Sequence, residues 1–417
     1  MTSRERVMAS INHKEPDELA MDLGSNVSAG ISGVAYTNLK DYLGMSGGHT
    51  RIYDVVQQVA QPELEVLDLV GADVLDVGRV YNEKDSDWYD VTLCNGKTGQ
   101  WPSWFKPVHM EDGSYNVYAA DGTHIARMPK GGMCFDQMYF PYRNAFPDNY
   151  DNLDAEMGKV LWSAMVHAPW DHKADFATEE AFYEDLRKRC IELRGQTDRA
   201  LMITCGCNLF EWGTFLRKME NYLMDTYLEP EKVIELNEQL MVRHLDMLKK
   251  VCDSVGDVVD ILRFGDDLGM DTGMFMAREK YQELFKPYHT QLNDYVHTHS
   301  QMKTFLHSCG SIYPVMGDLI DAGYDIINPV QTTAKDMDPA RLKQEFGKDI
   351  TFWGGGCNTR RVLNYGSPEE VYEYSRKMID IFYKDGGFVF NTEHNILPDV
   401  PPQNIMAMYK AVEDSRK

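Results

Sequence analysis

The 417-residue sequence lacks any apolar run that approaches the roughly 20 residues needed to cross a membrane. Its first residues, MTSRERVMASINHKEPDE, contain no apolar core of a secretion signal. Basic residues are scarce, because 42 Lys and Arg face 65 Asp and Glu, for a formal net charge of −23. A surface this negative repels phosphate backbones and anionic headgroups. We therefore expect a cytoplasmic protein whose partners include neither nucleic acid nor membranes.

Cysteine is also sparse, with eight residues scattered along the chain. This distribution favours reduced thiols or metal ligands over a disulfide framework. Apolar residues, in contrast, make up 43% of the sequence, which is ample for a large core. We find no linker composition, internal repeat or charge block, so we expect a single domain over residues 1–417.

Eight short apolar runs bounded by Gly, Asp or Asn predict buried strands. They are Leu19–Gly24, Asp73–Arg79, Ala200–Gly206, Asp260–Gly265, Lys303–Ser308, Asp325–Val330, Thr351–Gly355 and Phe388–Asn391. Helical patterns lie between them, as in Pro230–Cys252, Arg278–Ser300 and Ser367–Lys384. A doubly wound open sheet would give a similar alternation, but eight strands favour a parallel (β/α)₈ TIM-type barrel.

One segment, at about residues 87–170, interrupts the alternation between the second and third predicted strands. It is rich in aromatics, Gly and Pro and contains strand-like stretches, so we interpret it as a β-rich insertion that rises over one mouth of the barrel. Its aromatic residues would either line a flat pocket or form a local core: Trp101, Trp104, Phe105, Tyr139, Phe140, Tyr142 and Trp170.

Polar residues cluster just after the predicted strands, where the chemistry of a (β/α)₈ barrel is concentrated. They are Asp22, Asn26, Arg79, Cys205, Cys207, Asn208, Asp266, Asp267, His307, Cys309, Asn328, Gln331, Cys357, Asn391, Glu393 and His394. Cys205-Gly-Cys207 is too tightly spaced for a usual structural zinc site, and no Walker lysine follows the Gly354-Gly355-Gly356 run.

The sharpest pattern is His307-Ser-Cys309-Gly310. Alternate residues at a strand end point to the same side, so an imidazole and a thiolate there can chelate one metal ion. The alternative is a buried Cys beside a hydrogen-bonded His. A catalytic zinc site requires a third protein ligand. The spacing leaves several candidates open: His394, Cys357, Cys205, Cys207 and the Asp266-Asp267 pair.

The opening RERVMASINHKEPDELAMDLG, then GDDLGM, YQELFKPYH, HSCGSIYPVMGDLIDAGYDIINPV and NILPDVPPQNIMAMYKA, resemble the uroporphyrinogen decarboxylase superfamily over nearly the whole chain. The resemblance implies a (β/α)₈ barrel. The decarboxylase proper carries an Arg-Gln-Ala-Gly-Arg stretch that grips the porphyrinogen carboxylates, whereas this chain has DLGSNVSAGISG at the corresponding place. The missing arginines count against decarboxylation of that substrate.

The corrinoid-dependent methyltransferase branch of the superfamily, which includes the methylcobamide:coenzyme M methyltransferases, is the better match. It carries His-x-Cys-Gly at this strand end and binds zinc through it, which implies a zinc site at His307 and Cys309. Its third ligand is a Cys before an Ile-x-Pro-x-x-Pro-x-x-Asn-Ile segment. Alignment on Asn404-Ile405 places His394 at that position, with Cys357 as the rival third ligand.

A site with two imidazoles and one thiolate is a stronger Lewis acid than one with two thiolates. This favours an oxygen leaving group, so the chain resembles the O-demethylating first methyltransferases, which move a methyl group from a methyl ether, including aryl ethers, to cobalt(I). The cobalamin or other corrinoid is expected on a separate partner protein. Asp266 or Asp267 would be a fourth ligand or proton donor, and Glu393 would orient a ligand imidazole.

Two other interpretations stay open. One is a metal-independent lyase acting on a carboxylic acid, which would use cationic residues such as Arg79, Arg263, Arg360 and Arg361. The other is a non-catalytic barrel that binds a tetrapyrrole or a corrinoid protein, which would leave the His and Cys residues without a joint task. The sequence sets no oligomeric state.

Overall fold

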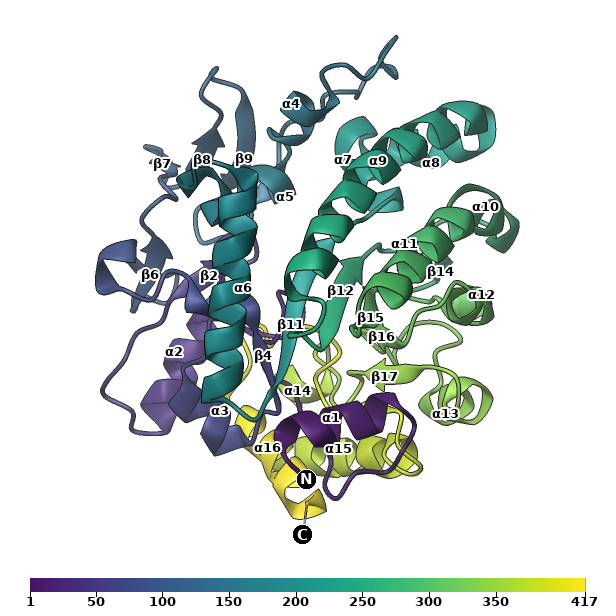
Figure 1. Cartoon of the computed structure of the whole chain (residues 1–417). Coiled ribbons are helices and arrows are strands. Elements are labelled where there is room, and N and C mark those ends of the chain that lie inside the picture. The colour runs from purple at the N-terminus through teal and green to yellow at the C-terminus, as the bar shows by residue number, and fades with distance from the viewer. Residues whose placement is uncertain (417) are drawn as a thin grey trace.

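A computed structural model describes residues 1–416. Seven parallel strands form its central sheet, in the order β18-β17-β16-β15-β12-β11-β4 (Figure 1). Their bounds are β4 Val74–Asp76, β11 Ala200–Gly206, β12 Ile261–Gly265, β15 Lys303–His307, β16 Ile326–Asn328, β17 Thr351–Trp353 and β18 Phe388–Val389. These are seven of the eight strands predicted from the sequence.

The eighth position, between β18 and β4, is occupied by the segment around Met21. Met21 forms a single parallel bridge with Phe390, and the N–H of Asp73 donates to the Met21 carbonyl at 2.8 Å. The first predicted strand is therefore wrong as a regular strand, because the Asp22 carboxylate accepts from the Ser25 hydroxyl at 2.6 Å and turns the chain. Backbone contacts on both sides still close the ring, and the fold is a TIM-type barrel.

Helices surround the sheet and connect successive strands (Figure 1). They are α6 Glu179–Gln196, α7 Phe210–Arg217, α8 Met219–Leu228, α9 Pro230–Val255, α10 Arg278–Leu284, α11 Lys286–His299, α12 Met316–Asp321, α13 Pro339–Phe346, α14 Val362–Tyr365, α15 Pro368–Phe382 and α16 Pro402–Ser415. The predicted helix Arg278–Ser300 is interrupted at Phe285, since Pro287 belongs to the first turn of α11. Ser367 caps α15 through a capping box with Glu370.

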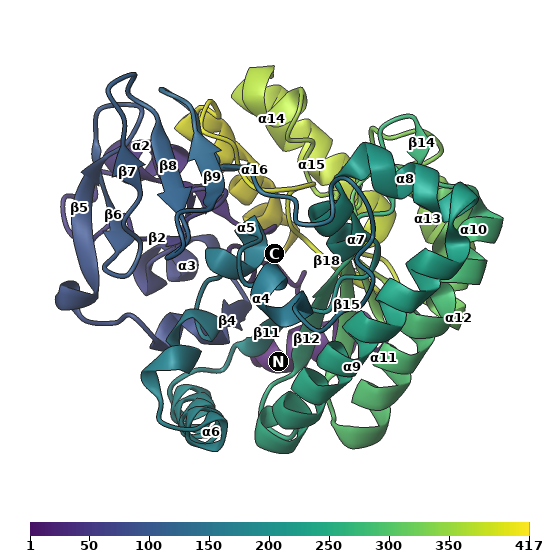
Figure 2. The ribbon, with the colours of Figure 1, turned by 90° about the horizontal axis from the view of Figure 1, so that it is seen from above.

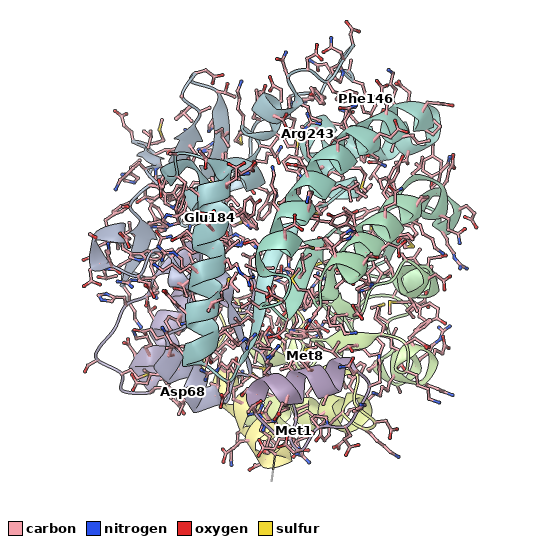
Figure 3. All side chains as sticks on the ribbon, viewed as in Figure 1. Met1, Met8, Asp68, Phe146, Glu184 and Arg243 are labelled. Carbon is pink, nitrogen blue, oxygen red and sulfur yellow. The ribbon has the colours of Figure 1, made fainter. Side chains whose placement is uncertain are left out.

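An apolar layer fills one end of the barrel. Its barrel residues are fully buried and pack together with Val7 and Ile11 of α1 (Ser3–Ile11): Ala20, Val74, Ala200, Met202, Ile261, Phe305, Ile326, Trp353 and Val389. Met8 of α1 packs against the same cluster and lies at the lower end of the molecule (Figure 3). Helix α1 therefore plugs this end of the barrel, which leaves the opposite end for the site.

Two positions further along, the residue is buried and polar in every barrel segment except β17, where Gly355 stands at that position. This polar layer consists of Asp22, Asp76, Thr204, Arg263, His307, Asn328 and Asn391. Side chains alternate between the two faces of a strand, so both layers project into the barrel. The change from apolar to polar marks where the packed core ends and a chemical site begins.

The predicted insertion is present between β4 and β11. A hairpin of β5 (Trp88–Thr92) and β6 (Thr98–Pro102) is followed by a four-stranded antiparallel sheet of β7 (Val108–His109), β8 (Tyr115–Tyr118), β9 (His124–Met128) and β10 (Asp136–Gln137). The short helices α4 (Leu153–Met157) and α5 (Leu161–Ala164) follow and lie in front of the barrel strands when the molecule is seen from above (Figure 2). The interpretation of the chain as a single domain that carries this insertion stays a prediction.

The sequence did not predict the secondary structure that the N-terminal region forms before β4. It forms β1 (Ile31–Ser32), β2 (Ile52–Asp54) and β3 (Val59–Ala60), a small antiparallel sheet flanked by α2 (Gly33–Tyr42) and α3 (Leu64–Val70). Its strands are only two or three residues long, which is too short for a visible alternation pattern. Among residues 1–416, no helix combines the length and apolarity that crossing a bilayer demands.

Candidate metal centre and cavity

A cavity of about 560 Å³ lies between the polar layer and the end of the insertion. Barrel residues such as Thr204, Arg263 and His307 form its inner wall, and Trp162 and Trp170 cover it from the insertion side. This volume suits a small organic molecule.

Three of the predicted ligands meet at the inner end of this cavity. One donor atom each from His307, Cys309 and His394 lies within 4.8 Å of the other two. The Cys309 thiol is 3.4 Å from Nε2 of His307, and the two imidazole rings are perpendicular, with centroids 5.5 Å apart. His307 is buried, whereas Cys309 and His394 are only partly buried, and both imidazoles line the cavity. Two nitrogens and one sulfur at this separation match the donor set of a catalytic zinc site that keeps one open position.

Asn328 fixes the orientation of the His307 ring. Its amide nitrogen donates to the carbonyl of Trp353 at 2.8 Å, so its Oδ1 must face His307. That oxygen accepts a 2.7 Å hydrogen bond from Nδ1 of His307. The proton is thereby held on Nδ1, and Nε2 keeps its lone pair directed at Cys309 and the metal position.

The loop after β15 is shaped by Gly310. Its φ of +85° is in the left-handed region, and a Cβ there would lie 2.4 Å from the backbone of Gly269. The Gly310 N–H donates to Oε1 of Gln331 at 3.0 Å, and the Cys309 N–H donates to Oδ1 of Asp267 at 2.8 Å. Glycine is therefore required at this position to bring the Cys309 thiol back beside His307.

Burial sets the charge state of the three donors. It lowers the pKa of His394 to about 4 and the pKa of His307 well below its usual value. Both rings are therefore neutral and able to bind a metal at neutral pH. Burial raises the pKa of the Cys309 thiol, so the thiolate needs a nearby cation to form. The donor chemistry thus fits a bound metal ion.

Cys357 lies apart from the three donors. It is fully buried in the hydrophobic core, beside Ser375 of α15. Burial raises the pKa of its thiol to about 12. The structure thus brings His394, and not Cys357, to the His307–Cys309 pair.

The adjacent Asp266 and Asp267 have different surroundings. Asp266 is buried and accepts from the backbone N–H groups of Phe210 and Glu211, at 3.1 and 2.9 Å, and lies 3.1 Å from Nε2 of His289. It caps the start of α7 and does not face the cavity. Asp267 lines the cavity, with its Oδ1 3.8 Å from Nε2 of His307. Of the two, only Asp267 lines the cavity beside the three donors, and its role there stays a prediction.

Glu393 forms no hydrogen bond with the imidazole of His307 or His394 within residues 1–416. Its Oε1 accepts from the Thr332 hydroxyl at 2.6 Å, and burial raises its pKa to about 7. The hydrogen bond that orients the His307 ring comes from Asn328, a strand-end candidate for which the sequence indicated no role, and a role for Glu393 stays a prediction.

The other strand-end candidates divide into two groups. Cys205, Cys207 and Asn208 line the cavity at the end of β11. The rest are tied into hydrogen bonds that support the loops: Asp22, Asn26, Gln331 and Asn391. Neither thiol of Cys205 nor that of Cys207 joins the three-donor group, so the structure offers no second ligand set from the Cys-Gly-Cys stretch within residues 1–416.

Most of the predicted aromatic candidates lie elsewhere. Of the seven, only Trp170 lines the cavity, whereas Trp101, Phe105 and Tyr142 are buried in hydrophobic packing. The aromatic wall instead comes from Trp162 of α5 and from Trp212 and Phe215 of α7. Sequence reasoning missed these residues because they lie on helices, although α7 directly follows a strand end, where a search could have extended.

Sequence reasoning also missed Glu211. It lines the cavity next to Asn208, and burial together with the nearby Asp267 carboxylate raises its pKa well above the usual value. Of the four arginines considered for a lyase, only Arg263 reaches the cavity. Arg79 donates to the Pro62 carbonyl, and Arg360 pairs with Asp271.

The profile of the family described as "Uroporphyrinogen decarboxylase (URO-D)" matches residues 204–415. The curated relatives include two proteins named uroporphyrinogen decarboxylase. That of Chloroherpeton thalassium is 23% identical over 188 residues, covering 42% of this chain and 51% of the relative. That of Methylococcus capsulatus is 33% identical over 96 residues, covering 23% of this chain and 25% of the relative. The matched part of this chain thus spans about half or less of their length.

Among solved structures, a methyltransferase from Methanosarcina mazei superposes with a TM-score of 0.60 at 12% sequence identity, covering 99% of both chains. This similarity extends to the N-terminal half that the profile leaves out and establishes a shared fold. Together with the profile match over half of the sequence, it agrees with the resemblance carried by the His-x-Cys-Gly motif. The chain belongs to the uroporphyrinogen decarboxylase family.

Proposed function

We propose that this protein is a zinc-dependent methyltransferase that passes a methyl group from a methyl ether to the cobalt(I) of a corrinoid carried by a partner protein. The observation that carries the proposal is the convergence of His307, Cys309 and His394 at the inner end of a cavity. These residues come from two different strand ends, and a structural role does not require them to share one point. The fold shared with the Methanosarcina mazei methyltransferase supports the same assignment.

When bound, zinc would supply a Lewis acid that stabilises the negative charge on the departing ether oxygen. His307, Cys309 and His394 would hold the ion, and Asn328 would keep His307 in the binding tautomer. Asp267 stands beside Cys309, where it would act as a fourth ligand or give a proton to the leaving oxygen. Because cobalt(I) is the nucleophile, no side chain has to form a covalent intermediate.

The shape of the cavity supports an aromatic methyl ether as the substrate. The rings of Trp212 and Phe215 contact each other edge to face, with centroids 5.9 Å apart. The ring centroid of Trp162 lies 6.2 Å from that of Phe215. Flat, rigid walls of this kind favour a planar ring over a flexible chain.

None of the eight cysteines forms a disulfide within residues 1–416, which agrees with a cytoplasmic setting.

The metal site is tested first by elemental analysis of the purified wild type and of four variants. We expect about one zinc per chain in the wild type, its loss in His307→Ala, Cys309→Ala and His394→Ala, and its retention in Cys357→Ala. The Cys357 variant is the matched control, since it also removes a thiol but outside the site. A wild type that binds no zinc even after reconstitution would contradict the proposal.

The transfer reaction is tested next, with methoxylated aromatics and a cobalt(I) corrinoid protein as the acceptor. Formation of methylcobalt is followed by its absorbance, and the demethylated phenol is quantified. We expect both products in equal amounts and neither in the His307→Ala variant. Zinc binding without transfer to any corrinoid would retain the metal site but refute the assigned reaction.

A metal-independent lyase is the second candidate, favoured by the names of the curated relatives and by Arg263 in the cavity. It predicts full activity after chelation and no effect of removing the Cys309 thiol. Decarboxylation of an aromatic acid by chelated enzyme would select this candidate over methyl transfer.

A further inference from the structure

Arg263 is a buried cation that forms no ion pair with a carboxylate within residues 1–416. Its side chain belongs to the polar layer, is 6% exposed and lines the cavity. One guanidinium nitrogen donates to the Ser28 hydroxyl at 2.9 Å, while Nε finds no hydrogen-bond partner in the described part of the chain. The other two cations that line the cavity are neutralised, because Arg243 pairs with Asp154 and Lys173 with Glu179. Buried guanidinium groups are usually paired, so a missing anion is indicated.

A second unpartnered polar group lies next to Arg263. Thr204 is its neighbour on the adjacent strand, in register across β11 and β12, and also lines the cavity. The Thr204 hydroxyl is buried and forms no hydrogen bond within residues 1–416. Two unsatisfied donors, one of them charged, therefore face the same part of the cavity. Burying two donors without acceptors lowers the stability of the fold, and a bound ligand that accepts from both would remove this cost.

The acidic neighbours of Arg263 do not fill this role. Asp267 and Glu211 influence the guanidinium electrostatically, yet neither forms an ion pair with it within residues 1–416. Asp267 instead accepts from the Cys309 N–H, and Glu211 accepts from the Asn208 amide. Together with Asp54, which also lines the cavity, they restrict the ligand, because several carboxyl groups in the wall disfavour a doubly charged phosphate more than a single carboxylate.

We propose that Arg263 and Thr204 form a carboxylate-binding subsite, so that the methylated substrate is a methoxylated carboxylic acid. This inference rests on the proposed methyl transfer and specifies its substrate. Arg263 lines the same cavity as His307 and His394, so an acid bound at Arg263 can extend its other end toward the metal position. The guanidinium fork and the hydroxyl together supply the directional donors that a carboxylate accepts.

The test compares acids with their uncharged amides in the absence of corrinoid protein. Binding of 3-methoxybenzoate, 3-methoxybenzamide, methoxyacetate and methoxyacetamide to zinc-loaded enzyme is measured by titration calorimetry. We expect at least one acid to bind about tenfold more tightly than its amide. Arg263→Gln should abolish this preference at unchanged zinc content, whereas Arg243→Gln, at an already paired cation, should preserve it.

Thr204→Val provides a readout that does not depend on the arginine. Because the native hydroxyl is unpartnered, this near-isosteric change should leave the melting temperature equal or higher and weaken the acid by about threefold without affecting the amide. The inference is overturned if no acid is preferred over its amide, or if the preference survives Arg263→Gln. Should that variant fail to fold, an unchanged acid affinity in Thr204→Val overturns it.

These outcomes are separable from the methyl-transfer proposal. Preferential binding of acids without any transfer to cobalt(I) would establish the carboxylate subsite and refute the assigned reaction. Transfer from neutral ethers as fast as from acids, with no effect of Arg263→Gln, would retain the reaction and refute the subsite.

Discussion

The apolar and polar layers of the barrel interior are separated by only two residues along the strands that build them, yet they differ in how their side chains bond. In the apolar layer, Phe305 is fully buried and its ring centroid lies 5.5 Å from that of Trp353. In the polar layer, His307 is nearly as buried but keeps a nitrogen directed at other donors. Burial therefore does not separate structural from functional residues in this barrel. What separates them is whether their bonding capacity is used up within the chain.

The largest effect is expected for Phe305→Ala. Removing a buried ring from the plugged end leaves a cavity and should cost about 3–5 kcal/mol of unfolding free energy, measured by urea denaturation. The folded fraction should still bind zinc. His307→Ala, two residues away, should lose the metal while the metal-free protein stays within about 1 kcal/mol of metal-free wild type. The distinction between the layers fails if the second change destabilises as much as the first.

Asn328→Ala should have the next largest effect, now within the polar layer alone. Without the Asn328 oxygen the Nδ1 proton of His307 is no longer held, so zinc affinity should fall by about 10–100-fold in a competition titration with a chelator. Asn391→Ala is the matched control, because the Asn391 amide bonds to backbone carbonyls away from the metal donors. Equal losses of zinc affinity in both variants would show that the polar layer acts as a whole.

Asp266 and Asp267 allow a comparison between two adjacent residues. Asp266→Asn weakens the cap of α7 and the contact with His289, so we expect a loss of about 1–3 kcal/mol in stability with zinc retained. Asp267→Asn should leave stability nearly unchanged and lower kcat for methyl transfer. The measurements are thermal unfolding and single-turnover kinetics. The reverse assignment of effects would place Asp266 in the site.

The smallest effect is expected at the aromatic wall. Trp212→Leu should raise KM about fivefold for an aryl methyl ether and barely for an alkyl methyl ether. The reason is that the change removes a stacking interaction worth about 1 kcal/mol of binding free energy. Trp101→Leu, in the core of the insertion, should lower stability instead and leave both KM values alone. Equal changes in KM for the two ethers would argue against an aromatic substrate.

Much of the site could be predicted because strand ends are visible in the sequence. His307 and Cys309 flank a strand end in the predicted register, and alignment on the C-terminal motif placed His394 with them. The roles of Glu393 and Asn328 could not be predicted in the same way. Both follow strands, and only the three-dimensional position shows that the Asn328 oxygen meets His307 while Glu393 meets Thr332.

The sequence alone determined the barrel, the insertion between its second and third strands and the strand ends at which polar residues gather, because these follow from local alternation and spacing. The tertiary structure decided which of those residues share a cavity, which of two adjacent aspartates faces it, and that Arg263 and Thr204 stand there without partners. Such facts depend on the closure of strands far apart in the chain. The closure of the barrel sets the distances between the donor atoms, and the sequence of a single strand does not contain this information.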